Sequence, residues 1–267
     1  MAFCYNFPLK TDRKLGVYLA FAKALFLITL LTSCNSNTNV HLDTVDYKRI
    51  EINDSLAQED SIAQFIAPYG AKINQEMNRV LCYNPKSMHK NDTPLNTALG
   101  NMLCEIIVEQ VNPVVKSRLD TNIDVVLLNH GGIRAPLPAG EVTTKRAYEI
   151  MPFENEVVVA QLNKAQMEQL IKYIVDRERA HPFSGMKISL NADSSLNNVS
   201  INDQPLTEKI YYVATSDYLY NGGDSMNFFN NTTVTKTDYK IRNAMIDYFK
   251  KVDTLKFESD NRFTKAN

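Results

Sequence analysis

The chain has 267 residues, of which 44 % are hydrophobic and 22 % charged, and it contains nine glycines and no tryptophan. This composition is ordinary for a globular protein and suffices for one large core or two small ones. The formal net charge is −1, so no basic excess argues for binding to nucleic acid.

The N-terminus has the pattern of an export signal. Basic residues precede the apolar run 24–31, which is too short for a typical membrane span. Cys34 follows Thr32 and Ser33, and this arrangement resembles the bacterial lipobox, in which the chain is cut before a cysteine that then carries lipid. We therefore predict a lipoprotein signal peptide over residues 1–33, lipidation at Cys34 and a polar tether over 34–58. The alternative is an uncleaved apolar anchor.

This N-terminal pattern predicts an exported protein, anchored by lipid to a bacterial membrane and facing the periplasm or the cell surface. Of the other cysteines, Cys4 would leave with the signal, while Cys82 and Cys104 remain. They are consistent with one disulfide in an oxidising compartment or with two buried thiols. The chain has no Cys-x-x-Cys pair, which argues against a zinc ribbon.

Helical and strand patterns alternate from residue 59 onward. Helices are predicted where apolar residues recur every three or four positions, and strands where short apolar runs lie between turn residues. The predicted helices span 59–79, 97–111, 144–150, 165–179 and 239–250. The predicted strands span 80–83, 124–128, 156–162, 186–190, 197–201 and 210–215. We expect Pro68 to break or kink the first helix, and the second helix to end before Pro113.

The alternation predicts a mixed α/β (α+β) fold, with residues 59–267 forming one domain that contains a substantial sheet and flanking helices. The direction of the strands is not readable from the sequence.

Two glycine-rich turns, Asn129–Arg134 and Asn221–Asp224, follow predicted strands. Glycine lets the backbone approach a ligand closely, and loops at strand ends commonly bind small molecules in α/β proteins. In this interpretation Arg134 donates to phosphate or ribose oxygens, and Asp224 accepts from a ribose diol. The alternatives are a turn whose arginine pairs with a surface carboxylate and an aspartate that only caps a turn or helix.

Phe153 lies in the loop before the predicted strand 156–162, and Tyr218 lies just before the second turn. Two aromatic rings on different loops could together clamp a flat base, a contact worth roughly 1–3 kcal/mol per base in proteins that bind single strands. Alternatively, both rings belong to the core. His130, between Asn129 and Gly131, is interpreted as a turn residue rather than a catalyst.

Together with Leu99–Cys104, Gly140–Thr143 and Met151–Asn155, these turns resemble the C-terminal domain of the 5′-nucleotidase family in order and spacing. The resemblance covers roughly residues 60–252. It implies a single domain with a mixed sheet and flanking helices that binds a nucleotide or nucleoside.

The resemblance also assigns roles by matching position. Phe153 and Tyr218 would stack on the base, Tyr218 replacing the usual phenylalanine, and Asn129 would contact the base. Arg134 would face the ribose or phosphate, and Asp224 the ribose hydroxyls.

Two departures stand out. Residues 91–96 lack the arginine that commonly precedes the Leu-Gly-Asn helix, which puts a second phosphate contact in doubt, and His130 stands where a small residue is usual.

In that family hydrolysis takes place in a metallophosphatase domain, whose two metals are held by Asp-x-His and Asn-His-Glu type motifs. None of the four histidines of this sequence lies in such a motif. We therefore expect no catalytic residue, metal site or cofactor in this chain, with divalent metals held by a partner.

The sequence thus predicts the nucleotide-binding part of a 5′-nucleotidase-type phosphoric monoester hydrolase, inactive alone and working with a separate metallophosphatase chain. The alternatives are a non-catalytic nucleoside-binding surface lipoprotein and a surface protein that binds another protein.

Overall fold

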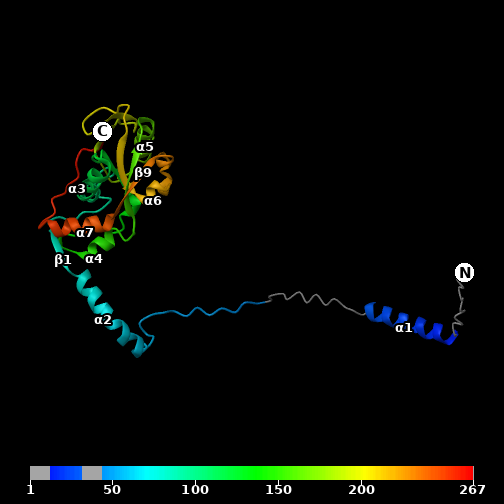
Figure 1. Cartoon of the computed structure of the whole chain (residues 1–267). Helices are drawn as coiled ribbons and strands as arrows, with labels where there is room; N and C mark the ends of the chain where they lie inside the picture. The colour runs from blue at the N-terminus through cyan, green and yellow to red at the C-terminus, as the bar shows by residue number, and fades with distance from the viewer. Residues whose placement is uncertain (1–12, 32–43, 267) are drawn as a thin grey trace, which may run out of the picture. The chain divides into compact units, whose positions relative to one another are not determined.

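The computed structural model describes residues 13–31 and 44–266 (Figure 1). It divides into two units, Met1–Ala57 and Gln58–Asn267. In the first unit, helix α1 (Arg13–Leu31) contains the apolar run of the predicted export signal. Cys34 lies outside the described residues. None of the helices in the described ranges has the length and apolar character needed to cross a membrane. Signal, lipidation and tether therefore stay predictions.

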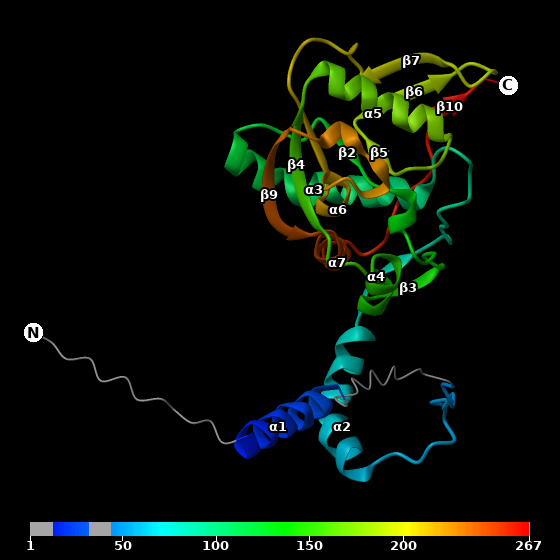
Figure 2. The same cartoon turned by 90° about the vertical axis from the view of Figure 1, so that its right-hand side faces the viewer.

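The second unit alternates helices and strands (Figures 1 and 2). Its α-helices are α2 (Asp60–Met77), α3 (Ala98–Leu119), α4 (Thr144–Ile150), α5 (Lys164–Arg177), α6 (Asp217–Tyr220) and α7 (Ile241–Lys251). Its 3-10 turns are η1 (His130–Gly132), η2 (Gly223–Ser225) and η3 (Asn227–Phe229). Its strands are β1 (Val80–Asn84), β2 (Val125–Leu127), β3 (Gly140–Thr143), β4 (Glu156–Leu162), β5 (Phe183–Ser184), β6 (Met186–Leu190), β7 (Leu196–Ile201), β8 (Tyr211–Ser216), β9 (Thr233–Lys240) and β10 (Phe263–Lys265).

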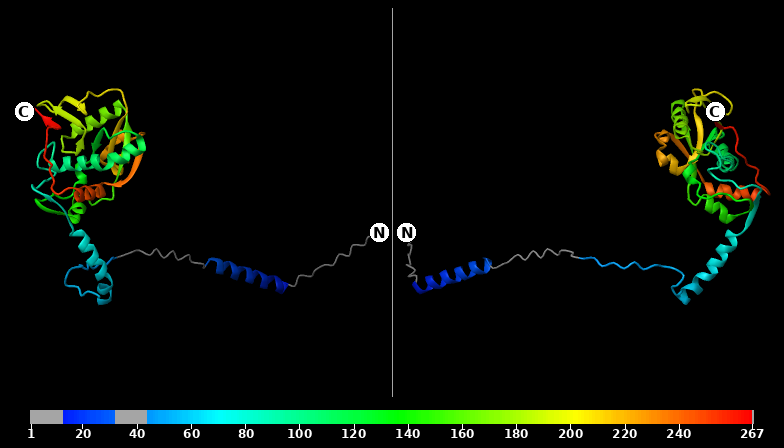
Figure 3. Two further views of the ribbon diagram at one scale, coloured as in Figure 1. Left: turned by 60° about the vertical axis from the view of Figure 1, so that its left-hand side comes forward. Right: turned by 180° about the vertical axis from the view of Figure 1, so that it is seen from behind.

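The main sheet has five strands in the order β5-β2-β8-β4-β9. Strands β2 and β8 are parallel, and every other neighbouring pair in this sheet is antiparallel. Strand β9, drawn in orange in Figure 3, forms one edge. Two smaller sheets pair β1 with β3 and order β10-β6-β7. The mixed sheet with its helices confirms the predicted fold class.

Each face of the main sheet packs against a different set of helices, because successive side chains of a strand point to opposite faces. Val126 and Leu128 join the cluster formed by α3 and α7, whereas Val125 and Leu127 join the cluster formed by α5. Strand β2 is buried on both sides, which explains its continuous apolar sequence.

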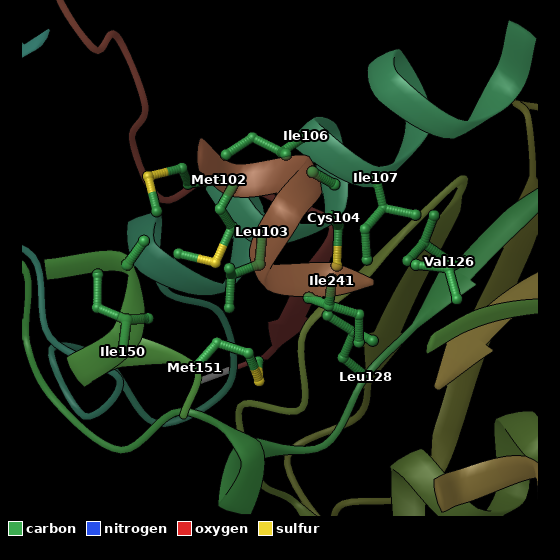
Figure 4. Close-up of a cluster of buried hydrophobic side chains, with 14 of the residues drawn as sticks. Met102, Leu103, Cys104, Ile106, Ile107, Val126, Leu128, Ile150, Met151 and Ile241 are labelled. Atoms are coloured by element: carbon green, nitrogen blue, oxygen red, sulfur yellow. The ribbon is translucent and has the colours of Figure 1, made fainter. Parts of the chain in front are cut away.

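The core between α3, α7 and the sheet fixes the end of β2 (Figure 4). Its buried side chains include Met102, Leu103, Cys104, Ile106, Ile107, Val126, Leu128, Ile150, Met151 and Ile241. Burying each large aliphatic side chain stabilises the fold by about 1.5–3 kcal/mol. The turn that begins directly after Leu128 is therefore attached to a rigid part of the core.

Helix α2 is continuous through Pro68, so the predicted break does not occur there. The prediction that the next helix ends before Pro113 is wrong, because α3 runs past Pro113 to Leu119. In α3 the continuation buries Val115, so tertiary packing outweighs the hydrogen bond that a proline removes. In α2 no residue is buried, and its apolar positions are exposed.

Other boundaries lie close to prediction. Strands β4 and β6 have the predicted limits, while β3, β5, β9 and β10 were not predicted. Helix α5 begins at a capping box in which Asn163 and Gln166 bond each other's backbone N–H groups.

Cys82 and Cys104 are buried free thiols, so the disulfide alternative does not hold. Burial raises the pKa of Cys82 to about 11.

Candidate functional site

A cavity of about 310 Å³ lies where the chain leaves β2 and β8. Because these strands are parallel neighbours, their carboxyl ends meet at one edge of the sheet, where α/β proteins commonly bind ligands. The residues that line the cavity are Asn129, Gly131, Gly132, Arg134, Phe153, Asn155, Tyr218 and Asp224. All five residues singled out from the sequence are among them.

The carboxylate of Asp224 ties the two glycine-rich turns together. Asn129 Nδ2 donates to Asp224 Oδ2 at 2.8 Å, and the Tyr218 hydroxyl donates to Asp224 Oδ1 at 3.1 Å. Each carboxylate oxygen can accept more than one hydrogen bond. Both oxygens therefore have a protein donor and can accept a further hydrogen bond, and Asp224 lines the cavity.

Glycine is required at two positions around this network. A Cβ atom at Gly132 would lie 2.7 Å from Asn129 Oδ1, and one at Gly223 would lie 2.5 Å from a ring carbon of Tyr218. Any larger residue would displace the Asn129 amide or the Tyr218 ring. The sequence predicts that these glycines let the backbone approach a ligand closely. In the structure they also make room for the Asn129 and Tyr218 side chains.

Asp224 has a backbone φ of 53°, in the left-handed region that favours glycine or asparagine. Tyr173, on α5, stabilises this conformation by donating its hydroxyl to the Asp224 carbonyl at 2.9 Å. The Tyr173 ring also has edge contacts with His181 and Phe228. Sequence reasoning missed Tyr173, because its contact with Asp224 joins residues 51 positions apart and has no local pattern.

Arg134 lies close to the ring of Phe153, which is in the loop that follows α4. The guanidinium carbon of Arg134 lies 5.8 Å from the Phe153 ring centroid, within the range of a cation–π contact. The main chain of Arg134 is held by an N–H bond to the Ile150 carbonyl at 2.9 Å. Phe153 is 40 % exposed and Tyr218 is 47 % exposed, so neither is a core residue.

Lys90 lies behind the first turn. Its ammonium donates to the Ile133 carbonyl at 2.7 Å. Its pKa is lowered, first by burial and then by the positive charges of Arg134 and Arg179. A second positive charge therefore lies near Arg134, although residues 91–96 contain no arginine.

His130 is a buried turn residue, 4 % exposed, with its Nε2 2.8 Å from Asn91 Oδ1. Its backbone N–H donates to His181 Nδ1 at 3.4 Å. Burial and then Arg179 and Lys90 lower the pKa of His130. His130 therefore shapes the turn from within the protein, in agreement with its interpretation as a turn residue.

Within residues 13–31 and 44–266, no group of three or more His, Cys, Asp or Glu side chains is arranged to hold a metal ion.

The chain matches known proteins over most of this unit. Residues 71–231 match the family model described as 5′-nucleotidase, C-terminal domain. Protein UshA from Yersinia enterocolitica is 31 % identical over 184 residues, which cover 66 % of this chain and 32 % of that protein. A 5′-nucleotidase-related protein from Glossina morsitans morsitans is 21 % identical over 289 residues, covering 98 % of this chain and 51 % of the relative.

Among solved structures, the 5′-nucleotidase precursor from Thermus thermophilus has the same fold, with a TM-score of 0.63 at 21 % identity. The match covers 79 % of this chain and 44 % of that structure. The chain thus spans about half, or less, of the length of these relatives. From the match of the family model, the chain belongs to the 5′-nucleotidase C-terminal domain family.

Proposed function

We propose that the cavity binds the nucleoside part of a nucleotide. The base stacks against Phe153 and Tyr218, with Asn129 at its edge, and the ribose diol donates to Asp224. Arg134 faces the phosphate end. The observation that carries this proposal is that two half-exposed aromatic rings, a carboxylate and a guanidinium line one cavity of about 310 Å³.

The chemistry of each group supports that orientation. Aromatic faces accept any flat base, and a hydrogen bond to a charged carboxylate is stronger than one to a neutral acceptor. Arg134 offers a planar fork of donors suited to phosphate, and Lys90 adds a second positive charge close by. The cavity volume is at the lower end of the range for small-molecule sites.

We further propose that this domain presents the nucleotide to a separate metallophosphatase chain, whose divalent metals would activate water and stabilise the leaving oxygen. The names of the relatives, which include 5′-nucleotidases, support this reaction class. In this proposal the present chain supplies binding and orientation, and it has no phosphatase activity by itself.

The binding proposal predicts that Phe153→Ala and Asp224→Ala each weaken adenosine binding by about 1–3 kcal/mol, through lost stacking and lost charged hydrogen bonds. Isothermal titration calorimetry with adenosine and AMP measures the effect. Asp203→Ala is a matched control, because Asp203 is an exposed carboxylate paired with Lys187 outside the cavity. Unchanged affinity in both site variants, with the fold intact, would place the site elsewhere.

Phosphate release from AMP tests the reaction. We expect release when this chain and a metallophosphatase chain are mixed with a divalent metal, and negligible release from this chain alone. Strong metal-dependent release by this chain alone would contradict the proposal. Nucleoside binding without any gain in the partner's rate would instead favour the non-catalytic nucleoside-binding protein.

A further inference from the structure

Arg242, in the first turn of α7, lies beneath the loop that carries Phe153. Its side chain is 4 % exposed. One nitrogen, Nη1, donates to three consecutive carbonyls, those of Met151 at 3.4 Å, Pro152 at 3.1 Å and Phe153 at 3.1 Å. A single guanidinium thus donates hydrogen bonds to three consecutive main-chain carbonyls of the loop.

The rest of the loop is bound to the same end of α7. Arg242 Nη2 forms an ion pair with Glu154, and the N–H of Ile241 donates to the Asn155 carbonyl at 3.0 Å. The guanidinium carbon also lies 4.1 Å from the ring centroid of Tyr148, on α4. Every residue of the segment 151–155 therefore has a contact with the first two residues of α7.

This arrangement depends on the positive charge of Arg242. Three carbonyl oxygens that point to one place repel each other, and a cationic donor offsets that repulsion more strongly than a neutral donor. An arginine in the first turn of a helix is also unfavourable for the helix dipole. The carbonyls and Glu154 offset the unfavourable positive charge of Arg242, and Arg242 in turn stabilises the conformation of the loop 151–155.

We propose that Arg242 is a positioning residue for base binding. It holds the backbone of the loop so that the Phe153 ring stands at the cavity. The 40 % exposure of Phe153 supports this role, because a ring with so much free surface takes its position from its backbone rather than from burial. This inference rests on the proposed function for its ligand, but its effect on the loop does not require one.

Mobility of the loop is tested without ligand. The chain has no tryptophan, so Phe153→Trp introduces a single tryptophan, a fluorophore that can be excited selectively at wavelengths where tyrosine does not absorb. Adding Arg242→Met should increase the amplitude of nanosecond motion in the fluorescence anisotropy decay of that fluorophore. Arg262→Met is the matched control, because Arg262 is also mostly buried, donates to the Phe183 carbonyl at 2.7 Å and pairs with Glu105 and Asp260. Equal mobility in all three proteins would overturn the inference.

A double-mutant cycle tests the link to binding. Arg242→Met should weaken adenosine binding about tenfold in the native background, and less than about twofold when Phe153→Ala is already present. Additive losses would overturn the inference, because Arg242 would then act independently of Phe153. Arg242→Lys, which keeps the charge but not the fork, should give an intermediate loss and serves if the methionine variant folds poorly. If the native chain does not bind adenosine at all, the proposed function fails, and the anisotropy alone decides the role of Arg242.

Discussion

At the scale of single residues, Asp224 is the centre of the candidate site. It accepts from the Asn129 amide and the Tyr218 hydroxyl, and Tyr173 holds its main chain. Charge-assisted bonds of this kind restrict a carboxylate to one orientation before any ligand arrives. Such pre-organisation lowers the entropy that binding must overcome.

In the proposed function, the tyrosine at position 218 offers a ring for stacking and also donates to Asp224, which a phenylalanine could not do. We expect Tyr218→Phe to keep the stacking surface but to weaken adenosine binding by about 0.5–1.5 kcal/mol, because Asp224 loses one of its two donors. Affinity for 2′,3′-dideoxyadenosine, which has no diol, should stay the same. Calorimetry with the two ligands separates these effects. An equal loss for both would mean that the hydroxyl does not act through Asp224.

At the scale of elements, the site depends on which strands are neighbours. The turns that carry Asn129 and Asp224 are 95 residues apart in the chain, and the parallel pairing of β2 with β8 brings them to one edge. Helix α5 then supports the turn that carries Asp224 through Tyr173, and helix α7 supports the loop that carries Phe153 through Arg242. Site side chains on loops thus take their precision from regular elements packed beneath them.

Element types were predicted better than element ends. The helical periodicity of α3 is a local property, whereas its continuation through Pro113 follows from burial of Val115. Edge strands such as β9 and β10 have mixed polar and apolar sequences. Their strand conformation depends on pairing with β4 and β6, which no local pattern shows.

At the scale of the whole molecule, burial of neutral histidines links stability to pH. His181 is 6 % exposed. Burial lowers its pKa to about 4; Arg179, His130 and Arg177 also lower it, whereas Asp224 raises it. Since the unfolded chain has a histidine pKa of about 6.5, the unfolded state binds a proton first as the pH falls. The contribution of His181 to the free energy of unfolding therefore decreases between about pH 6.5 and pH 4.

Between neutral pH and about pH 4.5, we expect the His181→Asn chain to lose about 1–3 kcal/mol less of its free energy of unfolding than the native chain. The amide can still accept from the His130 N–H but does not titrate in this range. Urea denaturation of the native and variant chains at the two pH values measures the difference. Parallel losses of stability in both chains would show that other groups, not His181, cause the acid sensitivity.

The sequence by itself determined the class of fold, most of the helices and strands, and five of the eight residues that line the cavity. The elements follow from periodicity, and the five residues follow from the glycine turns together with the resemblance to the 5′-nucleotidase family. Only the tertiary structure decided that β2 and β8 run parallel, that Cys82 and Cys104 are free thiols, and that Tyr173 and Arg242 hold the site. The Arg242 contact with Met151 spans 91 residues. Contacts of that range are chosen by packing of the whole domain, and a local stretch of sequence carries no record of them.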